Sequence, residues 1–132
     1  MRLALLRKSR AFSLVELLIV IIIIAVLAAV AIPRFANSSQ RSKESALRAD
    51  LKLYRNAIEL FKADCGVYPA SLSDLAATSS PASGLDSSGN TVAINAADWK
   101  GSYIQTIEND PISGAAFSYG TTSGSVGKVT SS

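Results

Sequence analysis

The first third of the chain contains one long hydrophobic stretch in which polar residues are almost absent. Apolar residues are continuous from Leu17 to Ile32, and Glu16 is the charged residue at the start of the stretch. As a helix rising about 1.5 Å per residue, residues 12–32 would be about 31 Å long, close to the hydrocarbon thickness of a bilayer. A core helix of a soluble protein would also carry a polar face. We therefore predict a membrane-spanning helix.

A different pattern follows Pro33, where apolar residues recur at every third or fourth position. The members of this stripe are Leu47, Leu51, Tyr54, Ile58, Phe61 and Cys65. Charged residues fill the opposite side, which is typical of a solvated face. We predict that the helix continues through Pro33 with a kink and packs its stripe on a small domain. Gly66 and Pro69 are expected to end it near Cys65.

Short β segments separated by Gly and Pro turns follow the helix. We predict strands at residues 103–107, 116–119 and 126–130. Together with the helix they indicate an α+β fold, in which one long N-terminal helix packs on a small antiparallel sheet.

Two further segments lie between the helix and these strands. Residues 71–76 are predicted to form a short helix, with Ser71 and Asp74 as a capping box. Residues 78–90 are rich in Ser and Gly and are predicted to be a flexible surface loop.

The charge of the chain is concentrated at its start. The 132 residues include 13 basic and 10 acidic ones, for a formal net charge of +3. Four of the basic residues, Arg2, Arg7, Lys8 and Arg10, lie in the first ten positions, where there is no acid. Without residues 1–11, nine basic residues face ten acidic ones, a side-chain charge of −1. The basic balance therefore does not predict nucleic-acid binding by the folded part.

The residue inventory argues against catalysis and against resident metals. The chain has no His and one Cys, so His-based acid–base relays and an intramolecular disulfide are excluded. The carboxylates show no paired spacing, and no Gly-rich phosphate loop or nucleophile elbow is present. We predict a protein that is not an enzyme. Cys65 is interpreted as a small buried residue at the end of the stripe, with intermolecular pairing as the alternative.

Three processing schemes fit the basic start and the apolar stretch. A secretory signal peptide would be cut after Ala31, where Ala29 and Ala31 match the small-x-small pattern. A plain signal anchor would keep the whole stretch. A third scheme cuts between Ala11 and Phe12. Length and flanking residues alone leave all three open.

The segment RAFSLVELLIVIIIIAVLAAVAIPRF, residues 10–35, resembles the N-terminus of type IV pilins and type II secretion pseudopilins. In that family a prepilin peptidase removes a short basic leader before a Phe, which is then N-methylated. Counted from Phe12, Glu16 is fifth and Pro33 twenty-second, as in the family pattern. The resemblance implies cleavage between Ala11 and Phe12 and methylation of Phe12. Ala11 departs from the Gly usually found before the cut.

The resemblance also implies a role for Glu16. A carboxylate inside a membrane segment costs about 2.5–3.5 kcal/mol on insertion scales and usually has a partner. In the family the fifth-position acid pairs with the α-amino group of a neighbouring subunit's first residue, here Phe12, during filament assembly. The alternative is a Glu that snorkels toward the headgroups.

The segments DCGVYPASLSDLA and ADWKGSYIQTIENDPISGAAFSYG are similar to the major, G-type pseudopilins of type II secretion. Tyr68-Pro69 and Asp110-Pro111 stand where that branch has turns. The resemblance implies a structural subunit that polymerises into a pseudopilus driving protein export. Implied partners are the prepilin peptidase/methyltransferase, copies of the chain, minor pseudopilins and an inner-membrane assembly platform. The alternatives are a major or minor type IV pilin, or a secreted binding domain released after Ala31.

This resemblance gives a three-part organisation. Residues 1–11 would be a cytoplasmic leader that is removed, residues 12–33 the transmembrane and filament-core segment, and residues 34–132 a periplasmic helix with a small globular domain. The expected location is the bacterial inner membrane, single-pass with a cytoplasmic N-terminus, and then a periplasmic filament.

Major pseudopilins often bind calcium in their late region. Here Asp98, Glu108 and Asp110 are the carboxylates near it, and the Ser/Thr-rich residues 113–132 contain no acid. Calcium needs several oxygen ligands, carboxylates among them. We therefore expect no cofactor and no metal site.

Overall fold

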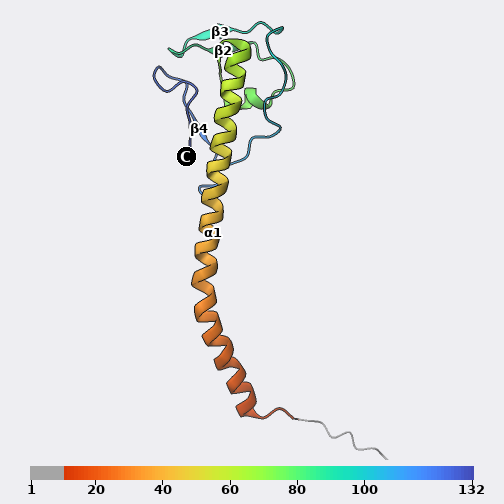
Figure 1. Cartoon of the computed structure of the whole chain (residues 1–132), viewed down its shortest axis with the longest axis vertical. Coiled ribbons are helices and arrows are strands. Elements are labelled where there is room, and N and C mark those ends of the chain that lie inside the picture. The colour runs from red at the N-terminus through yellow and green to blue at the C-terminus, as the bar shows by residue number, and fades with distance from the viewer. Residues whose placement is uncertain (1–10) are drawn as a thin grey trace, which may run out of the picture. The chain divides into compact units, whose positions relative to one another are not determined.

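The computed structural model describes residues 11–132, which divide into two compact units with a boundary between Gln40 and Arg41. The predicted leader, apart from Ala11, lies outside the described residues. The dominant element is α1, Leu14–Cys65, which Figure 1 shows as one uninterrupted helix. It is the predicted helix, although it begins two residues after Phe12.

The two ends and the interior Pro of α1 have local causes. At the C-terminal end, Gly66 adopts a φ of 74° and its N–H donates to the carbonyl of Lys62 at 2.8 Å. A left-handed glycine at this position closes the last turn, as predicted. Pro33 lies inside the helix, and α1 continues through it as expected. The kink at Pro33 stays a prediction.

In the unit of residues 41–132, the predicted stripe of α1 forms one wall of the hydrophobic core. Tyr54, Ile58 and Phe61 are buried together with Leu75 and Phe117. The rings of Tyr54 and Phe117 meet edge to face, with centroids 5.1 Å apart. Leu47, Leu51 and Cys65 are partly buried at the margin of this core. The amphipathic interpretation of this half of the helix is confirmed.

The strands form two small antiparallel sheets where one was predicted. The first contains β1 (Tyr68–Pro69), β2 (Ser83–Leu85) and β3 (Thr91–Ala93), in that order. The second pairs β4 (Ser118–Tyr119) with β5 (Val129–Thr130). Figure 1 shows β2 and β3 beside the C-terminal end of α1. β4 and β5 lie inside the strands predicted at 116–119 and 126–130.

The prediction of a strand at residues 103–107 is wrong. This segment has no strand pairing; the N–H groups of Tyr103 and Ile104 instead donate to the carbonyl of Leu75, at 2.9 and 3.1 Å. Its apolar side chains still serve the core, because Ile104 is buried and Tyr103 packs against Phe61. The apolar residues at 103–107 therefore indicate burial, although the segment itself is irregular.

Two predictions near β1 and β2 are also wrong. The flexible loop predicted at residues 78–90 contains β2, and Leu85 within it is buried. Tyr68-Pro69 is the strand β1 that pairs with β2, and it is not a turn. At Gly84 an added Cβ would lie 2.4 Å from the carbonyl oxygen of Tyr68, so only glycine permits this close approach. A Ser/Gly-rich composition therefore does not indicate flexibility in this segment.

The short helix and the late turn agree with the sequence. Residues Leu72–Ala76 form the 3₁₀-helix η1, and the N–H of Ser71 donates to Oδ2 of Asp74 at 2.8 Å. At Asp110-Pro111 the chain turns, with the N–H groups of Ile112 and Ser113 donating to Oδ1 of Asp110 at 2.7 and 3.3 Å.

Candidate assembly site at the start of the long helix

Ser13 and Glu16 form a reciprocal capping box at the first turn of α1. The Glu16 N–H donates to Oγ of Ser13 at 3.2 Å, and the Ser13 N–H donates to Oε2 of Glu16 at 3.1 Å. These two bonds satisfy backbone donors that a helix start leaves without an intrahelical partner. They also explain why α1 begins at Leu14. Glu16 thus has a structural function within its own chain.

The predicted cleavage site lies immediately before this turn. Ala11 and Phe12 are exposed and precede the helix, and the Phe12 side chain is 87% exposed. A peptidase needs an extended backbone it can reach, which a helix does not offer. The position of residues 11–12 is compatible with processing there, while the cleavage itself stays a prediction.

The apolar half of α1 has no polar covering within the part of the chain that the structure describes. Large side chains from Leu14 to Ile32 are exposed, including four consecutive isoleucines at 21–24. Among residues 11–132, α1 is the helix that is long and apolar enough to cross a membrane. Beside Glu16, a shallow hollow of about 430 Å³ opens between side chains of the first two turns. It is lined by Phe12, Glu16, Leu17, Ile19 and Val20. An apolar surface of this extent requires lipid or protein neighbours.

The predicted site residues fall into two places. Ala11, Phe12 and Glu16 lie together at the helix start. Pro33 lies 17 residues after Glu16, about 25 Å along the helix at about 1.5 Å per residue. The structure therefore does not bring Pro33 to the site of Glu16, and any function it has concerns the path of the helix.

Ser13 is the residue that sequence reasoning missed. The pattern Ser13-x-x-Glu16 before an apolar run is a capping-box signature and was visible in the sequence. The sequence interpretation of Glu16 includes a contact with a neighbouring subunit and snorkelling toward the headgroups, but not this short-range contact with Ser13.

The carboxylates considered for calcium are not gathered around a cation site. Asp110 is 1% exposed, and the hydroxyl of Ser131 donates to its Oδ2 while two backbone N–H groups occupy Oδ1. The hydrogen bond from Ser131 and those from the backbone lower the pKa of the Asp110 carboxyl. Within residues 11–132 no group of three Cys, Asp or Glu side chains could hold a metal ion. The absence of a cofactor stays a prediction.

Cys65 lies at the end of α1 beside Tyr103. Burial raises the pKa of the Cys65 thiol, and it raises the pKa of Tyr103 to about 12. The Tyr103 hydroxyl donates to Asp64 at 2.9 Å. A thiol with a raised pKa is a poor nucleophile at neutral pH. Pairing of Cys65 between chains stays a prediction.

Two known families match consecutive regions of this chain. Residues 6–32 match the prokaryotic N-terminal methylation motif, and residues 34–130 match the family described as type II secretion system (T2SS), protein G. The chain belongs to the protein G family of type II secretion. The two matches meet near Pro33, so the apolar segment is covered by the methylation motif, and the amphipathic helix with its small domain is covered by the protein G family.

Individual relatives support the same assignment. The type II secretion system core protein G of Klebsiella pneumoniae is 27% identical over 80% of this chain and 70% of its own length. The core protein G of Pseudomonas aeruginosa is 28% identical over 54% of this chain and half of its own length. The type IV major pilin of Myxococcus xanthus is 44% identical over 41% of this chain, but this covers only 24% of that pilin. No solved structure matches the chain.

Proposed function

We propose that this chain is a structural subunit of a type II secretion pseudopilus. The carrying observation is the order of the two family matches: a methylation motif over residues 6–32 followed directly by the protein G region over residues 34–130. In this proposal the apolar half of α1 first holds the subunit in the membrane and then bundles with other copies in a helical filament. In this proposal the chain acts by forming a polymer and catalyses no reaction. It is itself a substrate of processing enzymes.

Processing would prepare the helix start for this assembly. The prepilin peptidase cuts between Ala11 and Phe12, and the new α-amino group of Phe12 is methylated. The exposed, non-helical position of both residues supports access by the enzyme. The positive terminus is then four residues from Glu16.

The capping box leaves Glu16 able to serve a second chain. A carboxylate has two acceptor oxygens, and the contact with the Ser13 N–H uses Oε2. A neighbouring Phe12 amino group can approach the other oxygen without breaking the cap. Glu16 would then close its own helix start and set the register of the next subunit at the same time.

The location and partners follow from the same proposal. The subunit is anchored by a single pass in the bacterial inner membrane, with the domain of residues 34–132 in the periplasm. Its partners are the processing enzyme, further copies, minor pseudopilins and the membrane assembly platform.

A type IV pilin is the second candidate. It is favoured by the 44% identity to the Myxococcus pilin and by 39% identity over 60% of this chain to the type IV major fimbrial protein of Dichelobacter nodosus. The protein G match over residues 34–130 favours the secretion system. Release after Ala31 is disfavoured, because that bond lies inside α1.

Mass spectrometry of the protein extracted from membranes tests the processing step. A mature chain that begins with methylated Phe12 is expected. A chain beginning at Ile32, or an uncut chain in cells that hold the peptidase, would contradict the proposal.

Deletion and complementation of the gene then distinguish a function in type II secretion from a function in a type IV pilus. Loss of the gene should abolish secretion of exported proteins, and the intact gene should restore it. Loss of surface pili with secretion unchanged would instead support the pilin function.

A further inference from the structure

The second half of α1 exposes a face that its own domain does not cover. Its positions recur at every third or fourth residue, on the side opposite the buried Tyr54 and Ile58. We call this set the outer stripe: Ala46, Ala49, Leu53, Asn56, Leu60 and Ala63. The side chains of Leu53 and Leu60 are 50% and 58% exposed. Two leucines among alanines give a shallow surface on which another helix can pack closely.

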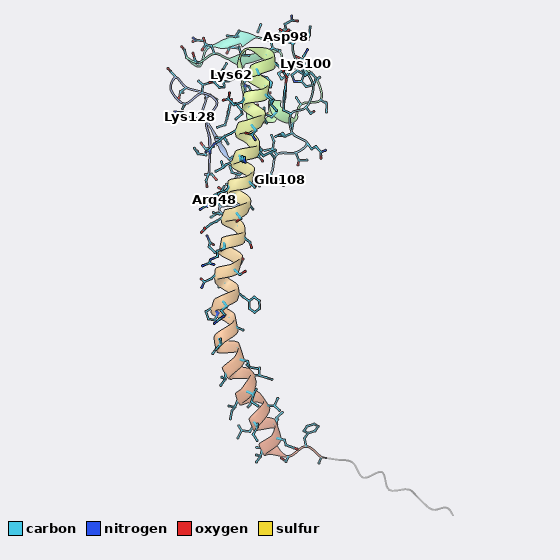
Figure 2. The ribbon with its side chains drawn as sticks, in the orientation of Figure 1. Arg48, Lys62, Asp98, Lys100, Glu108 and Lys128 are labelled. Carbon is cyan, nitrogen blue, oxygen red and sulfur yellow. The ribbon has the colours of Figure 1, made fainter. Side chains whose placement is uncertain are left out.

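The two flanks of the outer stripe carry opposite charges. Lys52 comes three residues after Ala49 and four before Asn56, so it borders one side of the stripe. Arg41, Arg48 and Arg55 lie further round on that side, and all four are exposed; Figure 2 labels Arg48. Glu59 is an acid within this basic flank.

The other flank carries two acids, and Lys43 lies at its N-terminal end, three residues before Ala46. Asp50 comes four residues after Ala46 and three before Leu53, and Asp64 comes four after Leu60. Asp50 and Asp64 are partly exposed, and Asp64 also accepts the hydrogen bond from Tyr103. A partner of uniformly acidic or basic surface would be repelled along one of the two flanks. A second copy of this helix carries both signs.

We propose that the outer stripe is an interface between copies of this chain, in which the second halves of two α1 helices lie side by side and parallel. Lys52 of one copy then lies near Asp50 of the next, with Leu53 and Leu60 between the charged rows. This inference rests on the proposed function, because membrane insertion gives every copy the same direction, and in parallel helices the basic flank of one copy faces the acidic flank of its neighbour. It extends assembly beyond the apolar segment and Glu16 to a part of the molecule outside the membrane.

A charge swap tests this contact in cells that carry the complete secretion system. Lys52→Glu and Asp50→Lys are made singly and together in the full chain. Each single change should lower the yield of sheared filaments about threefold relative to membrane-inserted subunit, the size expected of one partly exposed ion pair. The double variant reverses both flanks and should recover to within about twofold of wild type.

The control is Glu44→Lys, a charge reversal of the same size on the same helix. Glu44 is exposed, and no residue of the outer stripe lies three or four positions from it. Its filament yield should equal wild type. Loss of filaments in this variant as large as in Lys52→Glu would indicate a general charge effect and overturn the inference.

Cross-linking gives a second measurement. Leu53→Cys in a Cys65→Ala background should form dimers with a short bis-maleimide in filaments, whereas Glu44→Cys in the same background should not.

The two proposals fail in different ways. Filaments that form normally with either single charge variant, or a double variant that stays low, overturn the interface and leave the pseudopilin function standing. Absence of any filament from the wild-type chain overturns both.

Discussion

The two halves of α1 have the same secondary structure and obtain their stability from different sources. From Leu14 to Ile32 the side chains are exposed around the whole helix. From Leu47 to Cys65 one face is packed into a core of the chain's own residues. The first half has no core of its own, and its exposed apolar side chains need lipid or other subunits around them. The second half is stabilised largely by contacts within one chain, so its folded domain needs no neighbouring subunit to form its core.

The strongest test of this difference is truncation of a large side chain in each half. Phe61 is 0% exposed at the centre of the core, so Phe61→Ala should lower the free energy of unfolding of the domain by about 3–5 kcal/mol. Chemical denaturation of the detergent-solubilised full chain, followed by near-UV circular dichroism, measures the loss.

Ile24→Ala is the matched change in the apolar half. Ile24 is 58% exposed, so the same unfolding transition should not move. A comparable loss from Ile24→Ala would mean that the two halves are not independent.

Two substitutions of Glu16 distinguish its capping function within the chain from its proposed function between chains. Gln retains the acceptor of a capping box but not the charge. If the negative charge recruits a neighbouring Phe12 amino group, Glu16→Gln should lose about tenfold or more in filament yield, as should Glu16→Ala. Shearing and immunoblotting measure the yield. Normal filaments with Gln and few with Ala would assign Glu16 to capping alone.

Asp110 makes the domain sensitive to acid in a predictable direction. Its pKa is lowered in the folded state by hydrogen bonds from Ser131 and the backbone. Its contribution to stability is therefore full above the unfolded pKa of about 3.9 and is lost as the pH falls through the lower folded value. In Asp110→Asn, the melting temperature should be lower at neutral pH and should fall less below about pH 4 than in wild type. Parallel melting curves would contradict this account of Asp110.

Ser13→Ala should give the smallest effect. Loss of an N-cap acceptor costs about 1 kcal/mol in local helix stability. The apolar segment should still insert in the membrane, and filament yield should fall by less than for Glu16→Gln. Amide hydrogen exchange of residues 14–17 in detergent measures the local opening, with Ser38→Ala, inside the helix, as the control.

The helix could be predicted from the sequence because its two hydrophobic patterns extend over many turns. Gly66 and the burial of Tyr54, Ile58 and Phe61 agree with those patterns. The sheets could not be predicted as well. β2 depends on the close approach of Gly84 to Tyr68, and the 103–107 segment bonds to Leu75. These contacts join residues far apart in the chain, which local composition does not encode.

The candidate site shows the opposite case. Both partners of the capping box lie within four residues, so the sequence contained the contact in full. The family resemblance predicts a contact of Glu16 between chains and implies nothing about its contact with Ser13 in the same chain.

The hydrogen bonds of Tyr54 have a consequence for the order in which the domain forms. Its hydroxyl donates to the carbonyl of Glu108 at 3.2 Å and accepts from the Glu108 N–H at 2.9 Å, across 54 residues of sequence. Arg55 reaches the carbonyl of Val129, across 74 residues. Contacts this distant are slow to close and cannot form until the later residues are present. During synthesis these contacts of α1 therefore cannot form until Glu108 and Val129 have been added to the chain.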